Sequence, residues 1–360
     1  MPRLDAFRAS LNAADRRSLW AMGTVIVVLH LVGFGLLLAY VAPNHLLSTG
    51  VGVLAYTFGL RHALDADHIA AVDNTTRKLV TDLSDRTGRQ PLSVGFWFAL
   101  GHSTIVFLLA LALAAGVKSL VNPLEDDTST LHTITGIIGP SVSGSFLWLL
   151  GLLNLAALAG IVKVARRLRS GEYDEAQLEH HLHHRGLMNR LLAPLTRTVT
   201  KPWHIYPVGV LFGLGFDTAT EVGLLVLAGG AAAIQLPFWS IVVLPVLFAA
   251  GMCLADTADG VLMNAAYGWA NMQPVRKVFY NLIITTISVV VALVIGTIEL
   301  VGVLADRLSI TTGPVAAIAH IPLDYAGYAV VALFVVSWLV AASVWHFGDV
   351  EERWSADLAD

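Results

Sequence analysis

Eight long apolar stretches recur along this chain of 360 residues, with turn or charged residues between them. A helix of about 20 residues crosses the roughly 30 Å of hydrocarbon in a bilayer, and each stretch is long enough to do so. Only 13% of the residues are charged, against about 25% in an ordinary soluble protein, which argues against a soluble fold. The sequence therefore predicts an all-α, polytopic membrane protein with eight transmembrane helices. The predicted spans are residues 20–42, 50–72, 92–116, 143–163, 205–230, 237–263, 278–303 and 325–347.

The distribution of Lys and Arg orients these spans independently of their hydropathy, because cytoplasmic segments are enriched in basic residues. When the segments between spans are taken alternately, 19 of the 22 basic residues fall on one side and two on the other, with Arg61 inside a span. We therefore expect both termini to be cytoplasmic. The predicted parts are an N-terminal segment 1–19, a transmembrane domain 20–347 with a cytoplasmic histidine-containing loop at about 164–204, and a tail 348–360.

The charge balance, the cysteine count and the absence of one motif exclude several kinds of partner and site. The 22 basic residues do not exceed the 26 acidic ones, so nucleic acid is not an expected partner. One cysteine allows no internal disulfide framework and no cysteine-rich metal site. The chain has no GxxxxGK[ST] loop, so it does not bind ATP in that way. The lipid bilayer is the first partner that the sequence predicts.

Ionisable side chains cluster inside four of the predicted spans, where each costs about 2.5–3.5 kcal/mol. Six intramembrane carboxylates accompany only one arginine, so unpaired they would cost on the order of 15–20 kcal/mol, more than a typical folding stability. They must be protonated, wetted by a cavity or neutralised by a cation. The clustered residues are His62, Asp65, Asp67 and His68 in the second span, His102 in the third, Asp217 and Glu221 in the fifth, and Asp256 and Asp259 in the sixth.

The spacing in the second span limits how its residues can meet. At 100° per residue, His62, Asp65 and His68 lie within about 120° of one another on a helix. Asp67 points elsewhere if the helix is unbroken. Either Asp67 has a second role, or the helix is distorted here, as the discontinuous helices at transporter sites often are.

The donor types favour a transition metal. Imidazole nitrogen with carboxylate oxygen and no thiolate suits nickel, cobalt, zinc, manganese or ferrous iron. Magnesium and calcium prefer all-oxygen shells. We therefore predict a divalent metal site. The alternatives are a buried polar network that locks the helices together, a proton relay, and an intramembrane enzyme. The HExxH and GxGD motifs of intramembrane proteases are absent.

Four short motifs carry these residues. In order and over some 200 residues, they resemble the motifs of the nickel/cobalt transporter (NiCoT) family of bacterial and some eukaryotic membrane permeases. The motifs are RHALDADHI at residues 61–69, LGHST at 100–104, LGFDTATE at 214–221 and GMCLADTAD at 251–259.

The resemblance implies a permease, not an enzyme, that takes up Ni²⁺ or Co²⁺ across the inner (cytoplasmic) membrane of a bacterium. The metal ion is then its substrate, and no cofactor is expected. It also implies that His62, Asp67 and His68 handle the metal. Leu64, where the family more often has Phe or Val, lies in a neighbourhood associated with metal preference, and a histidine in the region of His30 tends to accompany cobalt acceptance. Transport of both metals is slightly favoured, while export and proton coupling remain open alternatives.

Overall fold

The structure, a computed structural model, describes residues 11–43, 49–87, 89–114, 130–169, 199–214, 238–270, 274–323 and 326–347. Every regular element in these ranges is helical, which agrees with the predicted fold class. The elements are α2 (Ala13–Leu36), the π-helical turn η1 (Leu37–Val41), α3 (Thr49–His62), α4 (Ala66–Thr87), α5 (Val94–Ala114), α7 (Thr130–Arg169), the 3₁₀ turn η2 (Pro202–Ile205), α10 (Tyr206–Gly213), α12 (Phe238–Ala270), α13 (Pro274–Arg307), α14 (Gly313–Ala319) and α15 (Ala326–Phe347).

Five of the described helices are long and apolar enough to cross a membrane. They coincide with five of the predicted spans, so the chain is a polytopic helical membrane protein. Most of the predicted span 205–230 lies outside the described residues. The five helical stretches are Ala13–Val41, Val94–Ala112, Ile137–Gly160, Ser240–Ala266 and Thr285–Arg307.

Two helices extend well beyond their apolar stretches. α2 begins at Ala13 because Asn12 and Asp15 cap it reciprocally: the Asp15 N–H donates to Asn12 Oδ1 at 2.8 Å, and the Asn12 N–H donates to Asp15 Oδ2 at 3.1 Å. α7 runs from Thr130 to Arg169, whereas the predicted span was 143–163. A helix need not end where the lipid ends, so hydropathy locates the spans better than the helix ends.

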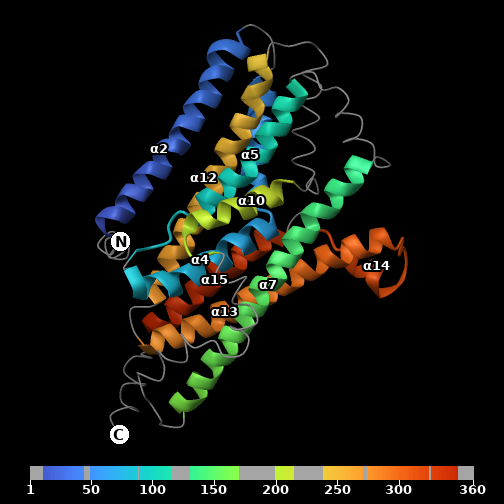
Figure 1. Cartoon of the computed structure of the whole chain (residues 1–360). Helices are drawn as coiled ribbons and strands as arrows, with labels where there is room; N and C mark the ends of the chain where they lie inside the picture. Colours follow the sequence, from blue (N-terminus) through green and yellow to red (C-terminus); the bar gives the residue numbers. More distant parts are fainter. Residues whose placement is uncertain are drawn as a thin grey trace.

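The long helices form two groups that meet at α4 (Figure 1). α12 packs against α2, α3 and α5, while α13 packs along α7. α4 contacts α12, α7, α13 and α15. The second half of the predicted span 50–72 is therefore the start of a central helix that joins the two groups.

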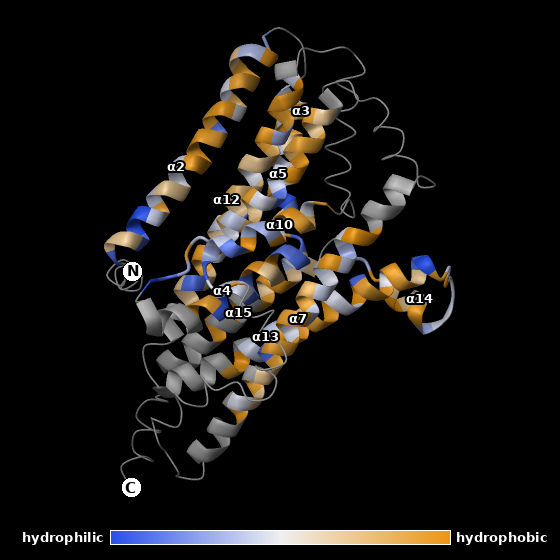
Figure 2. Ribbon diagram, viewed as in Figure 1, coloured by the Kyte–Doolittle hydropathy of each residue, from blue (hydrophilic) through white to orange (hydrophobic). Residues whose placement is uncertain are grey.

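α4 is hydrophilic in sequence and yet buried (Figure 2). From Ala66 to Val80 every residue except Asp67 is buried. Two of its buried charged groups find partners elsewhere in the chain: the Ser288 hydroxyl donates to Asp73 Oδ2 at 2.9 Å, and Lys78 Nζ donates to the Val199 carbonyl at 2.6 Å. Such a helix is protected from lipid by its neighbours.

A short turn, Ala63–Asp65, separates α3 from α4. The Leu64 and Asp65 N–H groups donate to the carbonyls of Arg61 and His62, each at 2.9 Å, which closes the end of α3. The Asp65 carbonyl then accepts the first bond of α4, from the Ile69 N–H at 3.1 Å. Of the two alternatives for the second span, the distorted helix is the one observed.

Candidate metal site

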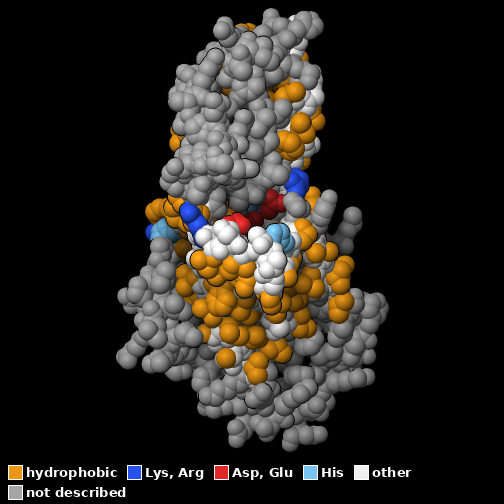
Figure 3. Space-filling model, turned by 90° about the vertical axis from the view of Figure 1, so that its right-hand side faces the viewer, with side chains coloured by type: hydrophobic (Ala, Val, Ile, Leu, Met, Phe, Trp, Pro, Cys, Tyr) orange, Lys and Arg blue, Asp and Glu red, His pale blue; other side chains and the backbone are white. Residues whose placement is uncertain are grey.

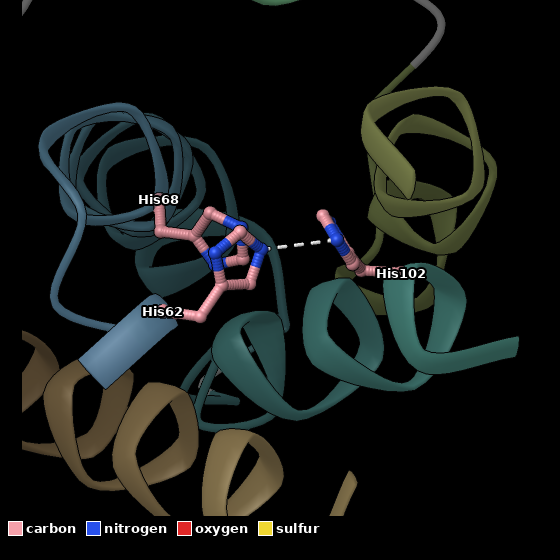
Figure 4. A group of neighbouring side chains, drawn as sticks. All are labelled: His62, His68 and His102. Atoms are coloured by element: carbon pink, nitrogen blue, oxygen red, sulfur yellow. Dashed lines mark hydrogen bonds between the residues drawn. The ribbon is translucent and has the colours of Figure 1, made fainter. Parts of the chain in front are cut away.

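Three buried histidines converge at the break between α3 and α4 (Figure 4). His62 is the last residue of α3, His68 lies in the first turn of α4, and His102 comes from α5. Their ring centroids are 4.4 Å apart for His62 and His68, 4.7 Å for His62 and His102, and 4.9 Å for His68 and His102. One ring nitrogen from each lies within 4.8 Å of the others. The break permits this, because it lets two residues six apart in sequence turn toward each other.

Two carboxylates orient these rings. Asp65 Oδ2 lies 3.0 Å from His62 Nδ1, and Asp256 Oδ2 lies 3.3 Å from His68 Nδ1. An ionised carboxylate can only accept a hydrogen bond, so in that state it places the proton of the facing ring on Nδ1 and leaves Nε2 its lone pair. Carboxylates hold metal-binding histidines in this way in many proteins.

The Nε2 atoms are the candidate ligands. Among the described residues, the buried Nε2 of His68 has no hydrogen-bond partner. His62 Nε2 lies 3.1 Å from His102 Nε2, so one ring donates to the other. Metal–nitrogen bonds of about 2.0–2.1 Å place two ligands of one ion about 3 Å apart. The pair is therefore already at ligand spacing, and a metal ion would replace this hydrogen bond.

Aromatic rings enclose the histidines. Phe98 lies 4.8 Å from the His68 ring, Phe212 6.4 Å from the same ring, and Phe248 5.7 Å from His62, measured between centroids. These rings exclude water from the imidazoles, which strengthens electrostatic interactions inside the site. Phe98 stands four residues before His102 on one helix face, a spacing that could have indicated that its ring lies near the His102 ring, 6.5 Å away between centroids. No comparable signal marks Phe248.

Two carboxylates near the cluster, Asp65 and Asp67, are more accessible than the rings. The side chain of Asp65 is 14% exposed, whereas that of His62 is 1% exposed. Asp67 is also partly exposed, and its Oδ1 accepts the His68 N–H at 2.9 Å. Figure 3 shows acidic side chains in a hollow at mid-height, next to basic and histidine side chains. Asp67 itself lies next to His68, in the first turn of α4.

The other predicted site residues are only partly brought together. Asp256 is buried against His68, as described. Asp259, one turn further along α12, has a buried Oδ2 without a hydrogen-bond partner among the described residues. Asp217 and Glu221 lie outside the residues that the structure describes, as does His180–His184 of the predicted loop.

The two residues associated with metal preference are not in the cluster. His30 Nδ1 lies 2.8 Å from the Ile26 carbonyl, and its Nε2 lies 3.2 Å from the Tyr56 hydroxyl, so both ring nitrogens have protein partners. Leu64 is the middle residue of the turn between α3 and α4. Because Leu64 lies in the connection between His62 and His68, it can affect the site indirectly, by changing the positions of these two residues.

Glycines bring the backbones around the site into direct contact. A Cβ on Gly95 would overlap the Asp256 carbonyl, and one on Gly59 would overlap the Phe248 carbonyl. A Cβ on Gly213 would lie 2.8 Å from the His102 carbonyl. Small residues allow such close helix packing in membranes. The site is therefore held by backbone contacts between helices, which the sequence motifs alone do not reveal.

Comparison with known proteins finds relatives that are transport proteins for nickel or cobalt. The family profile described as "High-affinity nickel-transport protein" (NicO) matches residues 48–344. The chain is 55% identical to the nickel transporter NicT of Mycobacterium tuberculosis, over 96% of this chain and 93% of that protein. It is 46% identical to the nickel transporter NixA of Staphylococcus aureus (92% and 95%), and 39% identical to the cobalt transport protein NhlF of Rhodococcus rhodochrous (90% and 91%). No solved structure matches the chain.

A match of this extent confirms the resemblance that the four motifs indicated. It also confirms the prediction of a transporter rather than an intramembrane enzyme, because the family is one of transport proteins. The buried cluster His62, His68 and His102, whose side chains could hold a metal ion, is consistent with such a protein. The chain belongs to the NicO (NiCoT) family of high-affinity nickel-transport proteins.

Proposed function

We propose that this protein is a permease for the uptake of nickel and cobalt ions, which bind between His62, His68 and His102. The observation that carries the proposal is the set of three buried imidazoles whose ligand nitrogens lie within 4.8 Å of one another. Nitrogen donors suit borderline divalent metals. The names of the relatives include both nickel and cobalt transporters.

The remaining predicted residues take supporting roles in this proposal. Asp65 and Asp256 orient the rings of His62 and His68. Asp67, at the more accessible edge of the site, attracts the incoming cation. Asp259, and with it Asp217 and Glu221, supplies further carboxylates along the path of the ion.

The membrane itself can drive uptake. Two positive charges that enter a cell at about −100 mV gain roughly 4.6 kcal/mol. Since each 1.4 kcal/mol is a factor of ten, this corresponds to a more than thousandfold accumulation. We therefore propose a carrier or uniporter in the bacterial cytoplasmic membrane, with eight spans and cytoplasmic termini.

Metal uptake tests the substrate and the site together. Cells that express the chain should accumulate radioactive nickel and cobalt, and His68→Ala should abolish accumulation at equal protein in the membrane. His320→Ala is the matched control, because His320 is an exposed histidine that follows the last residue of α14, outside the cluster. Full uptake by His68→Ala would refute the site, and loss of metal from preloaded cells would indicate export.

Cysteine labelling tests the topology. The chain has one cysteine, Cys253, and it is buried, so background labelling should be low. Single cysteines introduced into 1–10, the loop 164–204 and the tail 348–360 should react only with reagents that reach the cytoplasm. Labelling of any of them from outside intact cells would refute the proposed orientation.

A further inference from the structure

One glycine of helix α15 packs against the turn that connects His62 to His68. Gly327, the second residue of α15, is buried, and a Cβ added there would overlap the Leu64 carbonyl oxygen. The same Cβ would lie 2.7 Å from the Leu64 carbonyl carbon and 3.1 Å from the Ala66 nitrogen. The backbone of α15 therefore packs directly on the turn between α3 and α4, at a distance that only glycine allows.

The turn that Gly327 contacts sets the positions of two histidines. His62 immediately precedes the turn, and its ring is held by Asp65, the last residue of the turn. The Asp65 carbonyl begins α4, which carries His68 in its first turn. A displacement of the turn by a fraction of an ångström therefore moves His62 and His68.

Apolar packing extends the contact beyond the glycine. Val330, one turn further along α15, is buried in a cluster with Ala66, Ile69 and Ala70 of α4. α15 thus supports the turn and the first turn of α4 together. The two helices also lie next to each other in Figure 1.

The third histidine is held separately. His102 belongs to α5, where its backbone packs against Gly209 and Gly213 of α10. The spacing between His102 and the other two rings therefore depends on two independent helix contacts. One of these contacts is made by α15.

We infer that Gly327 is a positioning residue for metal binding: by fixing the turn Ala63–Asp65, α15 sets the ligand spacing of His62 and His68 relative to His102. This inference rests on the proposed function. Because metals differ in preferred ligand geometry, a shifted turn changes both the affinity for nickel and the preference between nickel and cobalt. α15 contributes no ligand to the cluster, so its effect is indirect.

The first test compares three alanine substitutions of glycine in nickel uptake, at matched amounts of protein in the membrane. Gly327→Ala should raise KM for nickel about tenfold or more, as changes next to metal ligands do, and should change the ratio of nickel to cobalt uptake. Gly302→Ala should leave both unchanged, because nothing lies within 4 Å of the added Cβ. Gly144→Ala controls for general damage, since its Cβ would crowd Leu300 of α13 at 2.8 Å, away from the turn.

A second pair of variants removes volume rather than adding it, in case Gly327→Ala does not reach the membrane. Val330→Ala loosens α15 on α4 and should raise KM and change the metal ratio in the same assay. Val289→Ala, at another buried valine, should change neither. Wild-type KM and metal ratio in Val330→Ala, or an equal change in Gly144→Ala, would overturn the inference. Uptake by the wild type and its loss in His68→Ala test the proposed function separately.

Discussion

Asp256→Asn is the most informative single change to the site, because it removes a charge and almost no volume. Asp256 is 1% exposed, and its Oδ2 faces His68 Nδ1 at 3.3 Å. An ionised carboxylate can only accept, so in that state Asp256 keeps the lone pair of His68 on Nε2. An amide can also donate, and in that orientation it would place the proton on Nε2, where the metal should bind.

The size of the effect follows from the geometry. Loss of a partner that orients a metal ligand typically costs 10–100-fold in affinity, or about 1.4–2.7 kcal/mol. The 3.3 Å separation is longer than the usual 2.7–3.2 Å of a hydrogen bond, which favours the lower end. The backbone should not move, because the Asp256 carbonyl packs on Gly95. We therefore expect an increase of about tenfold in KM for nickel.

Initial rates of nickel uptake over a range of metal concentrations measure this effect. Vmax should stay within about twofold, because the three imidazoles remain and saturating metal offsets an affinity loss of this size. Asp306→Asn, at an exposed carboxylate near the end of α13, is the matched control. An unchanged KM, or a loss of Vmax at unchanged KM, would refute the role of Asp256 as the group that orients His68.

Three further predictions concern residues around the site. Phe98→Ala removes a fully buried ring beside His68 and should destabilise the protein by about 3–5 kcal/mol; an unchanged melting temperature in detergent would contradict this. Asn154→Ala removes the donor to Asn74 between α7 and α4 and should cost about 1–3 kcal/mol, again seen as a lower melting temperature, with KM for nickel unchanged; a large change in KM would place Asn154 in the transport path. Gly95→Ala should push α5 away from the Asp256 carbonyl and reduce nickel uptake, whereas Gly302→Ala should not; equal uptake by the two variants would argue against close packing at Gly95.

Much of the site was predictable because its ionisable residues carry a free-energy cost inside apolar stretches. His62, His68 and His102 lie in apolar stretches, and ionisable groups at membrane depth need a specific reason. Their donor chemistry then restricts the ligand to a class of metals. Hydropathy also locates the helices, although α7 extends beyond the predicted span at both ends. The start of α2 at Ala13 was not predicted, although the spacing of Asn12 and Asp15 is that of a capping box.

The break after His62 was not predictable to the residue. Ala63, Leu64 and Asp65 include neither Pro nor Gly, so local propensity gives no reason for the helix to end there. The turn is instead in contact with distant parts of the chain, such as Gly327. A single sequence does not show which of its 31 glycines makes a close helix contact. These partners become visible only when the helices are packed.

The break also brings two helix ends of opposite polarity to one place. The carboxyl end of α3, at His62, carries a partial charge of about −0.5, and the amino end of α4, at Ala66, about +0.5. A cation is attracted by the first end and repelled by the second, while Asp67 in the first turn of α4 offsets the repulsion. An unbroken helix would present neither end. With the repulsion offset by Asp67, the carboxyl end of α3 is left as a net attraction for a cation at the break.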